Sequence, residues 1–414
     1  MNILLVASPL VSLRRPFNGG TESFIVHLAN QLCHVGHRVD VLAKDADETD
    51  LFQVIEFEES PYSMKDDLHT ETEGQNLFLA MQFALMDTSR YDIVHFNSYM
   101  PLLFDAFSLR QQPSIITLHT PPDDRYALLH RFHSERQPAA EYVCVSERLA
   151  KAWMQKITTR ITVIENGIDH DEVHSALNAP ISHASERSAF LWIGRICEDK
   201  NPLDAIRLAR AKNQLIKLAG PIGDAEYFRN NVEPHLGENC QYLGHLSSSE
   251  LYKTMAASRL LIASARWEEP FGLAVLEAMS LGTPVAGYSS AIAPELRAPK
   301  AVAIAAEDNL AGMCEAADVI EVHLLDGERL SDAAQVHSRR FNIDRMTAKY
   351  LHRYKQSIDS NANVTANANA IKPYQSTDSA TAQFDSNYDY HSDLLRASSR
   401  KRSSAKVSKT SEVS

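Results

Sequence analysis

Two glutamates flank an apolar segment in the stretch RWEEPFGLAVLEAMSLGTPVAG, which runs from Arg266 to Gly287. Glu269 comes before Pro270 and Gly272, and Glu277 follows eight residues after Glu269. On a helix this spacing would separate the two by about 12 Å, at ~1.5 Å of rise per residue. Because carboxylates accept hydrogen bonds from hydroxyl groups, the pair could bind a ligand that carries hydroxyls at two places.

Two cations in a second stretch, WIGRICEDKNP, could bind negative charge on the same ligand. Arg195 follows Gly194 at the end of a predicted strand, and Lys200 comes just before Pro202, which can open the next helix. Arginine offers a planar fork to phosphate oxygens, and lysine offers a mobile point charge. Taken alone, the two residues indicate either a diphosphate site or two solvated charges on a loop.

The elements around the glutamates read as strand, turn, helix and strand. LLIASA, residues 260–265, has the length of a buried parallel strand. The residues that recur at the three- and four-residue steps of a helix are Leu273, Leu276, Glu277 and Ser280. Gly282 is placed to end that helix in a left-handed conformation, and Pro284 prevents its continuation. The start of such a helix lies at the carboxyl edge of the sheet, where free N–H groups attract phosphate. The glutamates would therefore bracket an anion, and a nucleotide-sugar, with phosphates between two groups rich in hydroxyls, is such a ligand. The alternative is that both glutamates are ordinary surface charges that flank a helix.

Strands and helices alternate along the chain in two series. Predicted strands of the first series are ILLVA, VDVLA, DIVHF, SIITLH and YVCVS, and those of the second are AFLWIG, LIKLAG, CQYLG, RLLIASA and PVAGY. Helical patterns between the strands predict an α/β fold with parallel sheets. We expect two doubly wound, Rossmann-like domains over residues 1–170 and 171–342, with a ligand cleft between their sheet edges.

The overall composition is that of a globular protein. Its 414 residues are 44% hydrophobic and carry a net charge of −12, which gives no indication of a nucleic acid partner. The five cysteines are scattered without CxxC spacing, so neither a disulfide framework nor a zinc site is expected. No apolar run approaches the ~20 residues that a membrane helix needs. These features favour a cytoplasmic protein.

The chain from residue 357 to residue 414 changes to Asn, Ser, Ala and Thr without periodicity, which predicts a disordered tail. Six Lys or Arg and no acidic residue lie between Arg396 and Lys409. This basic segment could associate weakly with an anionic membrane, which would place the protein at the inner membrane face, or with another polyanion. A solvated basic end is the alternative.

Two further features stand in the first half of the chain. GGTE, residues 19–22, follows the first predicted strand, and its glycines could bring backbone close to a ligand or simply form a turn. His119, at the end of IITLH, could be a base, a neutral hydrogen-bonding group or a structural residue. His95, in DIVHFN, is expected to be packed in the core or to lie behind the site.

In their order along the chain, GRICEDKNP, LAGPIGD, YLGHLSSSELY and EEPFGLAVLEAMSLGTPVAGY resemble the nucleotide-sugar half of the retaining glycosyltransferases of family 4, which have the GT-B fold. GGTE, TLHTPPDD, VSE and VIENGID resemble landmarks of the other half. The resemblance covers roughly residues 1–355 and is greatest for bacterial UDP-glucose-type transferases. It implies a helix over residues 343–356 that crosses back to the first domain.

The resemblance also implies roles for individual residues. Glu269 would contact hydroxyls of the donor sugar, and Glu277 would contact the ribose. Arg195 and Lys200 would hold the diphosphate and stabilise the leaving nucleotide, and His119 would border the sugar. The remaining residues implied for the donor site are Gly20, Gly194, Phe271, Gly272 and Leu273. After VAGY the family has a glycine-rich turn, whereas SSAIAPEL here weakens the case for Ser289 and Ser290 as phosphate contacts.

The implied reaction moves a hexose from a nucleotide-diphosphate sugar, UDP-glucose or a similar donor, to a hydroxyl acceptor that the sequence does not identify. No cofactor and no metal ion are expected, because no acidic pair of the DxD type ends a strand and cations already face the phosphates. A covalent intermediate on Glu269 and same-face attack both remain open. Alternative functions are a GT-B phosphorylase, a sugar epimerase, or a catalytically silent carbohydrate-binding relative. A dehydrogenase fits less well, because no GxGxxG follows the first strand.

Overall fold

A computed structural model describes the chain in segments. They are residues 1–8, 11–57, 78, 80–97, 112–122, 124, 127–128, 130–131, 140–177, 187–324 and 328–370. Contacts divide the chain into one unit of Met1–Thr365 and a second of Ala366–Ser414. The predicted basic segment between Arg396 and Lys409 lies outside the described residues.

The first half of the chain forms a sheet of seven parallel strands in the order β3-β2-β1-β4-β5-β6-β7. Successive residues of β1 enter two different cores, Ile3 and Leu5 on one face and Leu4 and Val6 on the other. A sheet buried on both faces explains why its strands are continuously apolar. The strands are β1 (Asn2–Val6), β2 (Arg38–Ala43), β3 (Gln53–Glu56), β4 (Ile93–Phe96), β5 (Ser114–Leu118), β6 (Glu141–Cys144) and β7 (Ile161–Val163).

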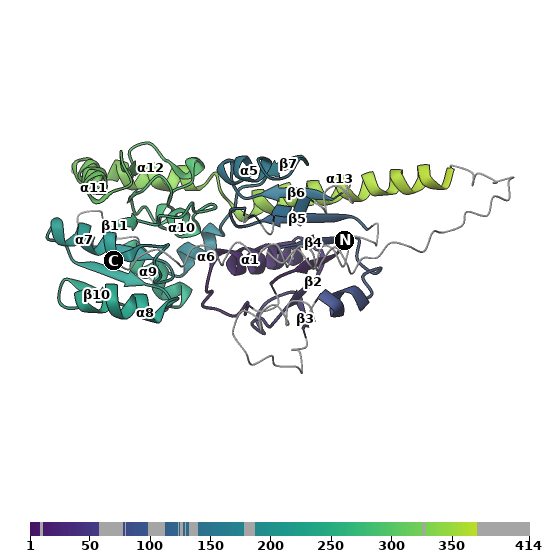
Figure 1. The fold of residues 1–414 in the computed structure, drawn as a ribbon, viewed down its shortest axis with the longest axis horizontal. Helices are drawn as coiled ribbons and strands as arrows, with labels where there is room; N and C mark the ends of the chain where they lie inside the picture. Colours follow the sequence, from purple (N-terminus) through teal and green to yellow (C-terminus); the bar gives the residue numbers. More distant parts are fainter. Residues whose placement is uncertain are drawn as a thin grey trace, which may run out of the picture. The chain divides into compact units, whose positions relative to one another are not determined.

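The second half forms a parallel sheet of six strands in the order β10-β9-β8-β11-β12-β13. In both sheets the strand order reverses beside the first strand, which is the doubly wound arrangement that leaves a crevice at the carboxyl ends. The predicted α/β fold with two Rossmann-like sheets is therefore confirmed (Figure 1). The strands are β8 (Ser188–Ile193), β9 (Ile216–Ala219), β10 (Cys240–Tyr242), β11 (Ser258–Ala263), β12 (Val285–Gly287) and β13 (Val302–Ile304).

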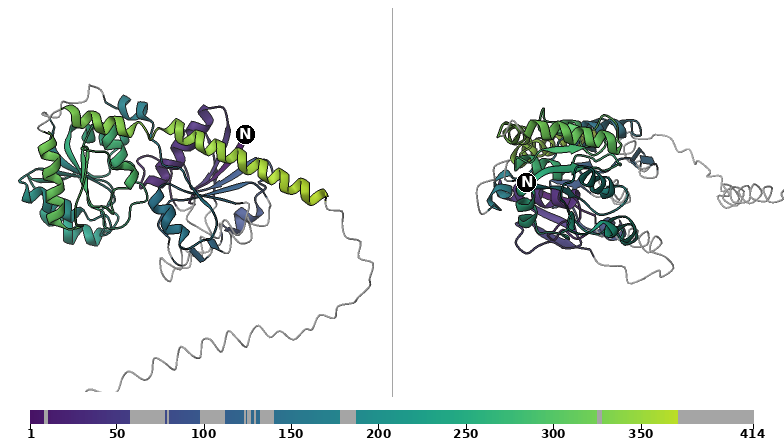
Figure 2. Two further views of the ribbon diagram at one scale, coloured as in Figure 1. Left: turned by 90° about the horizontal axis from the view of Figure 1, so that it is seen from above. Right: turned by 90° about the vertical axis from the view of Figure 1, so that its left-hand side faces the viewer.

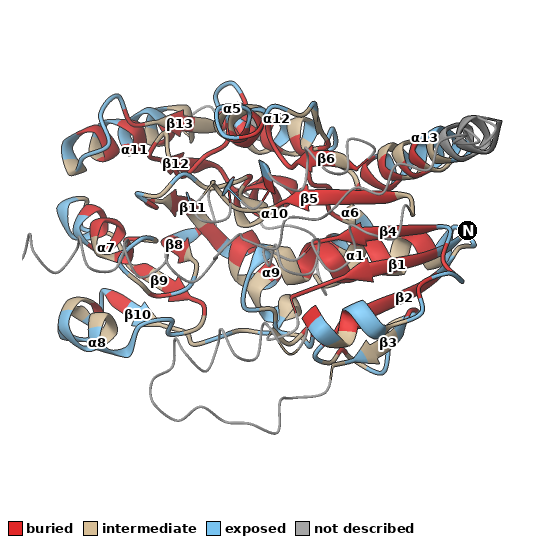
Figure 3. Cartoon of the chain, turned by 45° about the vertical axis from the view of Figure 1, so that its right-hand side comes forward, coloured by how far each residue is buried: buried red, intermediate tan, exposed pale blue. Residues whose placement is uncertain are grey.

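Helices cover the sheets, and their buried faces point toward the strands (Figure 3). In the first half, the helices whose bounds lie within the described residues include α1 (Gly20–His34) and α5 (Glu147–Met154). In the second half they are α6 (His170–Ser175), α7 (Pro202–Ala211), α8 (Ala225–Tyr227), α9 (Ser248–Ala257), α10 (Leu273–Ser280), α11 (Leu310–Leu324) and α12 (Glu328–Ser338), with the short helices η3 (Phe228–Val232), η4 (Glu233–His235) and η5 (Pro294–Leu296). None of the helices in the described segments is long and apolar enough to cross a membrane.

The last helix, α13 (Ile343–Ala370), returns to the first sheet, along which it runs in Figure 1 and in the left view of Figure 2. Tyr350 and Tyr354 are fully buried in the core that β1 shares with α1. The helix extends beyond the predicted residues 343–356, and the predicted start of the tail at 357 falls inside it. Ser357 is buried and Ile358 packs on the same core, so tertiary contact rather than apolar periodicity maintains the helix there.

We call the two halves the first lobe (β1 to β7 with α13) and the second lobe (α6 to α12). Two chain segments, one at Ile168 and one at residues 341–343, connect the lobes and lie side by side. The Ile168 N–H donates to the Phe341 carbonyl at 3.1 Å, and the Ile343 N–H donates to the Ile168 carbonyl at 2.9 Å. A Cβ atom added to Gly167 would lie 2.5 Å from the Asn342 carbonyl oxygen. Only glycine allows this close approach.

Candidate functional site

A cavity of about 990 Å³ lies at the carboxyl ends of the two sheets. It is lined from the first lobe by the GGTE turn and His119, and from the second lobe by the start of α10 and the loop after β8. All of the predicted site residues border it: Gly20, His119, Gly194, Arg195, Lys200, Glu269, Phe271, Gly272, Leu273 and Glu277. The structure thus brings together residues that are as far as 257 positions apart in the sequence, counted from Gly20 to Glu277.

Lys200 and Glu269 form an ion pair in the cavity wall. Their side chains are 17% and 18% exposed, so water screens the pair only in part. The indole N–H of Trp267 donates to the same carboxylate oxygen of Glu269 at 2.9 Å, and the Lys200 ammonium lies 4.5 Å from the centre of the Trp267 ring. Trp267 therefore fixes both charged groups, although the sequence analysis gave it no role.

Helix α10 begins at the cavity with no side-chain cap from the described residues. Its N-cap, Gly272, has φ of +101°, in the left-handed region that favours glycine. The first N–H groups of the helix therefore remain available to an anion. Gly20 of the first lobe packs against this helix start, since a Cβ at Gly20 would lie 3.4 Å from Leu273 Cδ1.

Glu277 lies on α10 in a half-buried position facing α1 and α6. Burial raises the pKa of its carboxyl to about 7, with the charge of His27 opposing this rise and the charge of Glu172 adding to it. His27 Nε2 is 3.3 Å from a carboxylate oxygen of Glu172, and His27 Nδ1 is 3.1 Å from the Ser23 hydroxyl. The Glu277 carboxyl can therefore change its protonation near neutral pH.

Arg195 is exposed in the cavity wall, and its side chain makes no hydrogen bond or ion pair with any described residue. On the facing wall, burial raises the pKa of Glu22, while the positive charge of Arg195 acts in the opposite direction. The backbone at Glu22 and Gly19 also acts to lower this pKa. Glu22 thus places a carboxyl group near the cation predicted to hold phosphate, which the motif GGTE alone did not indicate.

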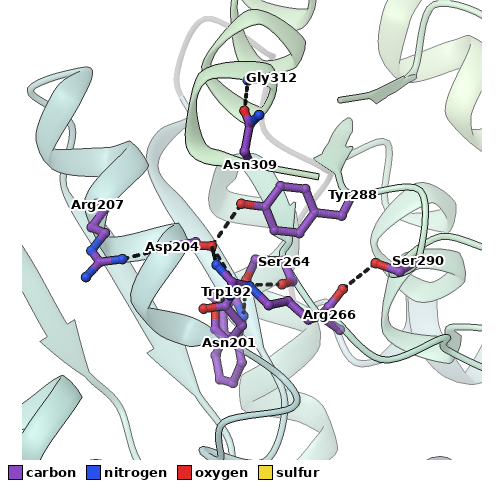
Figure 4. A network of polar contacts seen from close by, with 11 residues as sticks. Trp192, Asn201, Asp204, Arg207, Ser264, Arg266, Tyr288, Ser290, Asn309 and Gly312 are labelled. Atoms are coloured by element: carbon purple, nitrogen blue, oxygen red, sulfur yellow. Dashed lines mark hydrogen bonds and ion pairs between the residues drawn. The ribbon is translucent and has the colours of Figure 1, made fainter. Parts of the chain in front are cut away.

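A buried carboxylate behind the cavity, Asp204 on α7, fixes the loop that carries Lys200 (Figure 4). It accepts hydrogen bonds from Asn201 Nδ2 at 2.7 Å, Arg266 Nη2 at 2.9 Å and the Tyr288 hydroxyl at 2.9 Å. Burial raises the pKa of Asp204, but these hydrogen bonds outweigh it and hold the pKa below its ordinary value. The carboxylate thereby ties the β8–α7 loop to the turn after β11 and to the end of β12.

The first lobe holds the Glu269 loop through Arg148 of α5. Its guanidinium donates to the carbonyls of Ser289 at 2.7 Å, Glu269 at 2.6 Å and Ser290 at 2.9 Å. Beside it, the Glu147 N–H donates to Glu295 Oε1 at 2.6 Å. The carbonyls of the two serines are thus engaged by an arginine of the other lobe. These contacts connect the two lobes, and local sequence patterns do not predict them.

His119 directly follows β5, and His95 lies within the neighbouring strand β4 of the first sheet. His119 Nε2 is 3.1 Å from Asn97 Oδ1, and burial lowers the pKa of His119 to about 3. His95 is fully buried between the Tyr354 hydroxyl and the Thr117 hydroxyl, each at 2.7 Å, as expected for a packed residue. His119 is therefore a neutral ring that borders the cavity.

Comparison with known families agrees with this geometry. Residues 18–172 match the model described as Glycosyltransferase Family 4, and residues 176–334 match the model described as Glycosyl transferases group 1. The chain belongs to the family 4 glycosyltransferases of the GT-B kind. This glycosyltransferase is accordingly an enzyme, and its two family matches correspond to the two lobes around the cavity.

Relatives of this glycosyltransferase include proteins with different products. It is 26% identical over 310 residues to the glycogen synthase of Mycobacterium tuberculosis, covering 64% of this chain and 73% of that protein. It is 24% identical over 284 residues to the phosphatidyl-myo-inositol mannosyltransferase of Mycolicibacterium smegmatis, covering 64% of this chain and 72% of that one.

Solved structures share the fold of this glycosyltransferase. The sucrose-phosphate synthase of Thermosynechococcus elongatus has a TM-score of 0.68 at 16% identity, over 87% of this chain and all (100%) of that one. The Anabaena protein HepE, solved in complex with UDP-glucose, has a TM-score of 0.66 at 18% identity over the same shares of the two chains, 87% and 100%. At these identities the likeness concerns the fold.

Proposed function

We propose that this enzyme is a retaining hexosyltransferase that uses UDP-glucose or a similar nucleotide-sugar and transfers the hexose to a hydroxyl acceptor. The observation that carries the proposal is the arrangement of charge around the start of α10. Glu269 and Glu277 stand on either side of its uncapped N-terminus, and Arg195 and Lys200 border the same cavity. A ligand with hydroxyls at both ends and phosphates between them matches this order of groups.

In the proposed complex the diphosphate lies against the N–H groups at Gly272 and Leu273, with Gly20 close by on the first lobe. Lys200 then exchanges the Glu269 carboxylate for a phosphate oxygen, and Glu269 becomes free to accept from sugar hydroxyls. Glu277 accepts from the ribose. In the proposed complex, the two partners of the Lys200–Glu269 ion pair thus bind different parts of the donor.

The proposed chemistry forms a bond between the acceptor oxygen and C1 of the hexose while the bond from C1 to the β-phosphate oxygen breaks. The acceptor proton passes to the departing phosphate, and the nucleoside diphosphate leaves. Arg195 and Lys200 favour this step because negative charge grows on the leaving phosphate. In this complex the Trp267 N–H still donates to the Glu269 carboxylate. A carboxylate that accepts this hydrogen bond and those of the sugar hydroxyls is a weaker nucleophile, which supports same-face attack over a covalent intermediate on Glu269.

Two of the similar proteins support the choice of a glucose donor. HepE was solved with UDP-glucose, and the similar mycobacterial protein is named a glycogen synthase. A third similar protein is named a phosphatidyl-myo-inositol mannosyltransferase, so a nucleotide-sugar with another hexose is the alternative donor. A panel of nucleotide-sugars, assayed for hydrolysis and for transfer, identifies the donor directly.

The decisive experiment distinguishes the roles of Glu269 and Glu277. Variants of each are studied by calorimetric titration with UDP and with a slowly reacting UDP-glucose analogue. Glu277→Gln should weaken both ligands, because both contain the ribose. Glu269→Gln should leave UDP nearly unaffected and weaken only the UDP-sugar. Glu268→Gln, an exposed neighbour that does not line the cavity, is the matched control. Equal loss of UDP affinity in both site variants refutes the assignment, and a glycosyl adduct on Glu269 refutes same-face attack.

A further inference from the structure

Asn97, which had no role in the sequence analysis, lies directly behind His119. It follows β4, is 1% exposed, and its backbone N–H donates to the Val6 carbonyl of β1 at 2.8 Å. Its side chain therefore starts from a rigid backbone in the middle of the first sheet. The neighbouring strand β5 places His119 beside it.

The two hydrogen bonds of the Asn97 amide determine which way it faces. Asn97 Nδ2 donates to the His95 carbonyl at 3.3 Å, and Oδ1 lies 3.1 Å from His119 Nε2. Exchanging the oxygen and nitrogen would set two oxygens against each other at His95. Only the observed orientation satisfies both groups, so Asn97 presents an acceptor to His119.

The orientation of Asn97 fixes the proton on the His119 ring. An amide oxygen only accepts, so His119 Nε2 must carry the hydrogen. A neutral imidazole has one N–H, and the second nitrogen, Nδ1, then holds a lone pair. Within the described residues Nδ1 has no hydrogen-bond partner, and the ring borders the cavity with Phe24 packed at 4.7 Å between ring centres.

We propose that Asn97 is a positioning residue that holds His119 in the Nε2–H form, so that Nδ1 accepts a hydrogen bond from a hydroxyl of the donor sugar. This proposal rests on the proposed function for the identity of the ligand, but not for the tautomer. It adds a specificity rule: a sugar that carries an acceptor-only group, such as a carboxylate, in place of that hydroxyl would face the Nδ1 lone pair and bind less well.

The tautomer is measured by nitrogen NMR on protein labelled in its histidine rings, with the His119 signals identified by their loss in His119→Gln. We expect the wild-type ring to be neutral and protonated on Nε2 at pH 7. Asn97→Leu removes the acceptor, so the ring should populate the Nδ1–H form. Asn97→Asp keeps the acceptor and adds a negative charge, so Nε2–H should persist and the ring should gain a second proton at higher pH than in the wild type.

The same variants are titrated with UDP and with UDP-glucose. Asn97→Leu should leave UDP affinity within about twofold and weaken UDP-glucose by roughly 3- to 10-fold, the effect of one hydrogen bond. Preserved UDP binding also shows that the variant is folded, and Asn97→Ser provides a smaller substitution if the leucine variant does not fold.

Two results would overturn the proposal: a wild-type His119 protonated on Nδ1, or a tautomer that does not change in Asn97→Leu and Asn97→Ser. A changed tautomer with unchanged UDP-glucose affinity would overturn the contact between Nδ1 and the sugar. Failure of the proposed function is distinguishable from these outcomes. It would appear as the absence of any nucleotide-sugar binding or turnover in the wild type, while the NMR result still tests Asn97.

Discussion

UDP-glucose should bind about tenfold more weakly at pH 6 than at pH 8, because its affinity depends on the charge of Glu277. The pKa of this carboxyl is raised to about 7, mainly by burial. Ribose hydroxyls donate best to the ionised form, so binding favours loss of the proton. With a pKa of about 7, roughly 10% of the sites are protonated at pH 8 and roughly 90% at pH 6. The change amounts to about 1.4 kcal/mol of binding free energy.

The assay is calorimetric titration at pH values between 6 and 8, repeated in buffers of different ionisation enthalpy to count the protons released. UDP-glucose is the better ligand, because free UDP has a second phosphate ionisation in this range. Glu277→Gln should remove the pH dependence. Glu172→Gln should move it to lower pH, since the charge of Glu172 raises the pKa of Glu277, and His27→Gln should move it to higher pH. A wild-type affinity that stays flat, or a slope that persists in Glu277→Gln, would refute the reasoning.

Further substitutions test the rest of the site. Arg195→Ala should cost about 2–4 kcal/mol of transition-state stabilisation, measured as kcat/KM, because one preorganised donor to the leaving group is lost; turnover at the wild-type rate would contradict the assignment. Trp267→Phe keeps a ring near Lys200 but removes the N–H donor to Glu269, so UDP-glucose affinity should fall by about 1 kcal/mol with UDP affinity unchanged. Arg148→Ala removes the charged donor to the carbonyls of Glu269 and Ser290, whereas the Ser289 carbonyl still accepts from Arg297, and it should lower kcat/KM by about 1–3 kcal/mol in a chain that still binds UDP. Deleting residues 371–414 should leave the melting temperature and donor turnover unchanged, since that composition does not predict a packed core; a fall in melting temperature would show that the deleted segment packs on the fold.

Local patterns were sufficient to predict the elements that present the second-lobe residues. The three- and four-residue steps after Leu273 predicted α10, and Gly282, which follows it, has the expected left-handed conformation with φ of +71°. The strands before and after this helix were also predicted correctly. These signals depend only on neighbours in the chain, which explains why Glu269 and Glu277 could be placed at a helix start.

Contacts between distant segments were beyond the reach of the same patterns. Asn97 and Arg148 act through residues of other strands or of the other lobe, and nothing beside them in the sequence indicates these partners. The short strands β3, β7 and β13 were missed. They lie at the edges of their sheets and are mostly only partly buried, so they lack the apolar run of a central strand. The end of α13 was predicted too early, because its last buried positions depend on the first-lobe core rather than on helix pattern.

The paired connection between the lobes limits how the cleft can open. If Ile168 and Asn342 were separate linkers, the lobes could tilt and twist independently about each. Because the two segments are hydrogen-bonded to each other and Gly167 lies too close to Asn342 for any other residue, they act as one hinge. The lobes can then rotate relative to each other about a single hinge axis. Every closure would return Gly20 to the same point on Leu273, so the donor pocket would be rebuilt in the same geometry in each catalytic cycle.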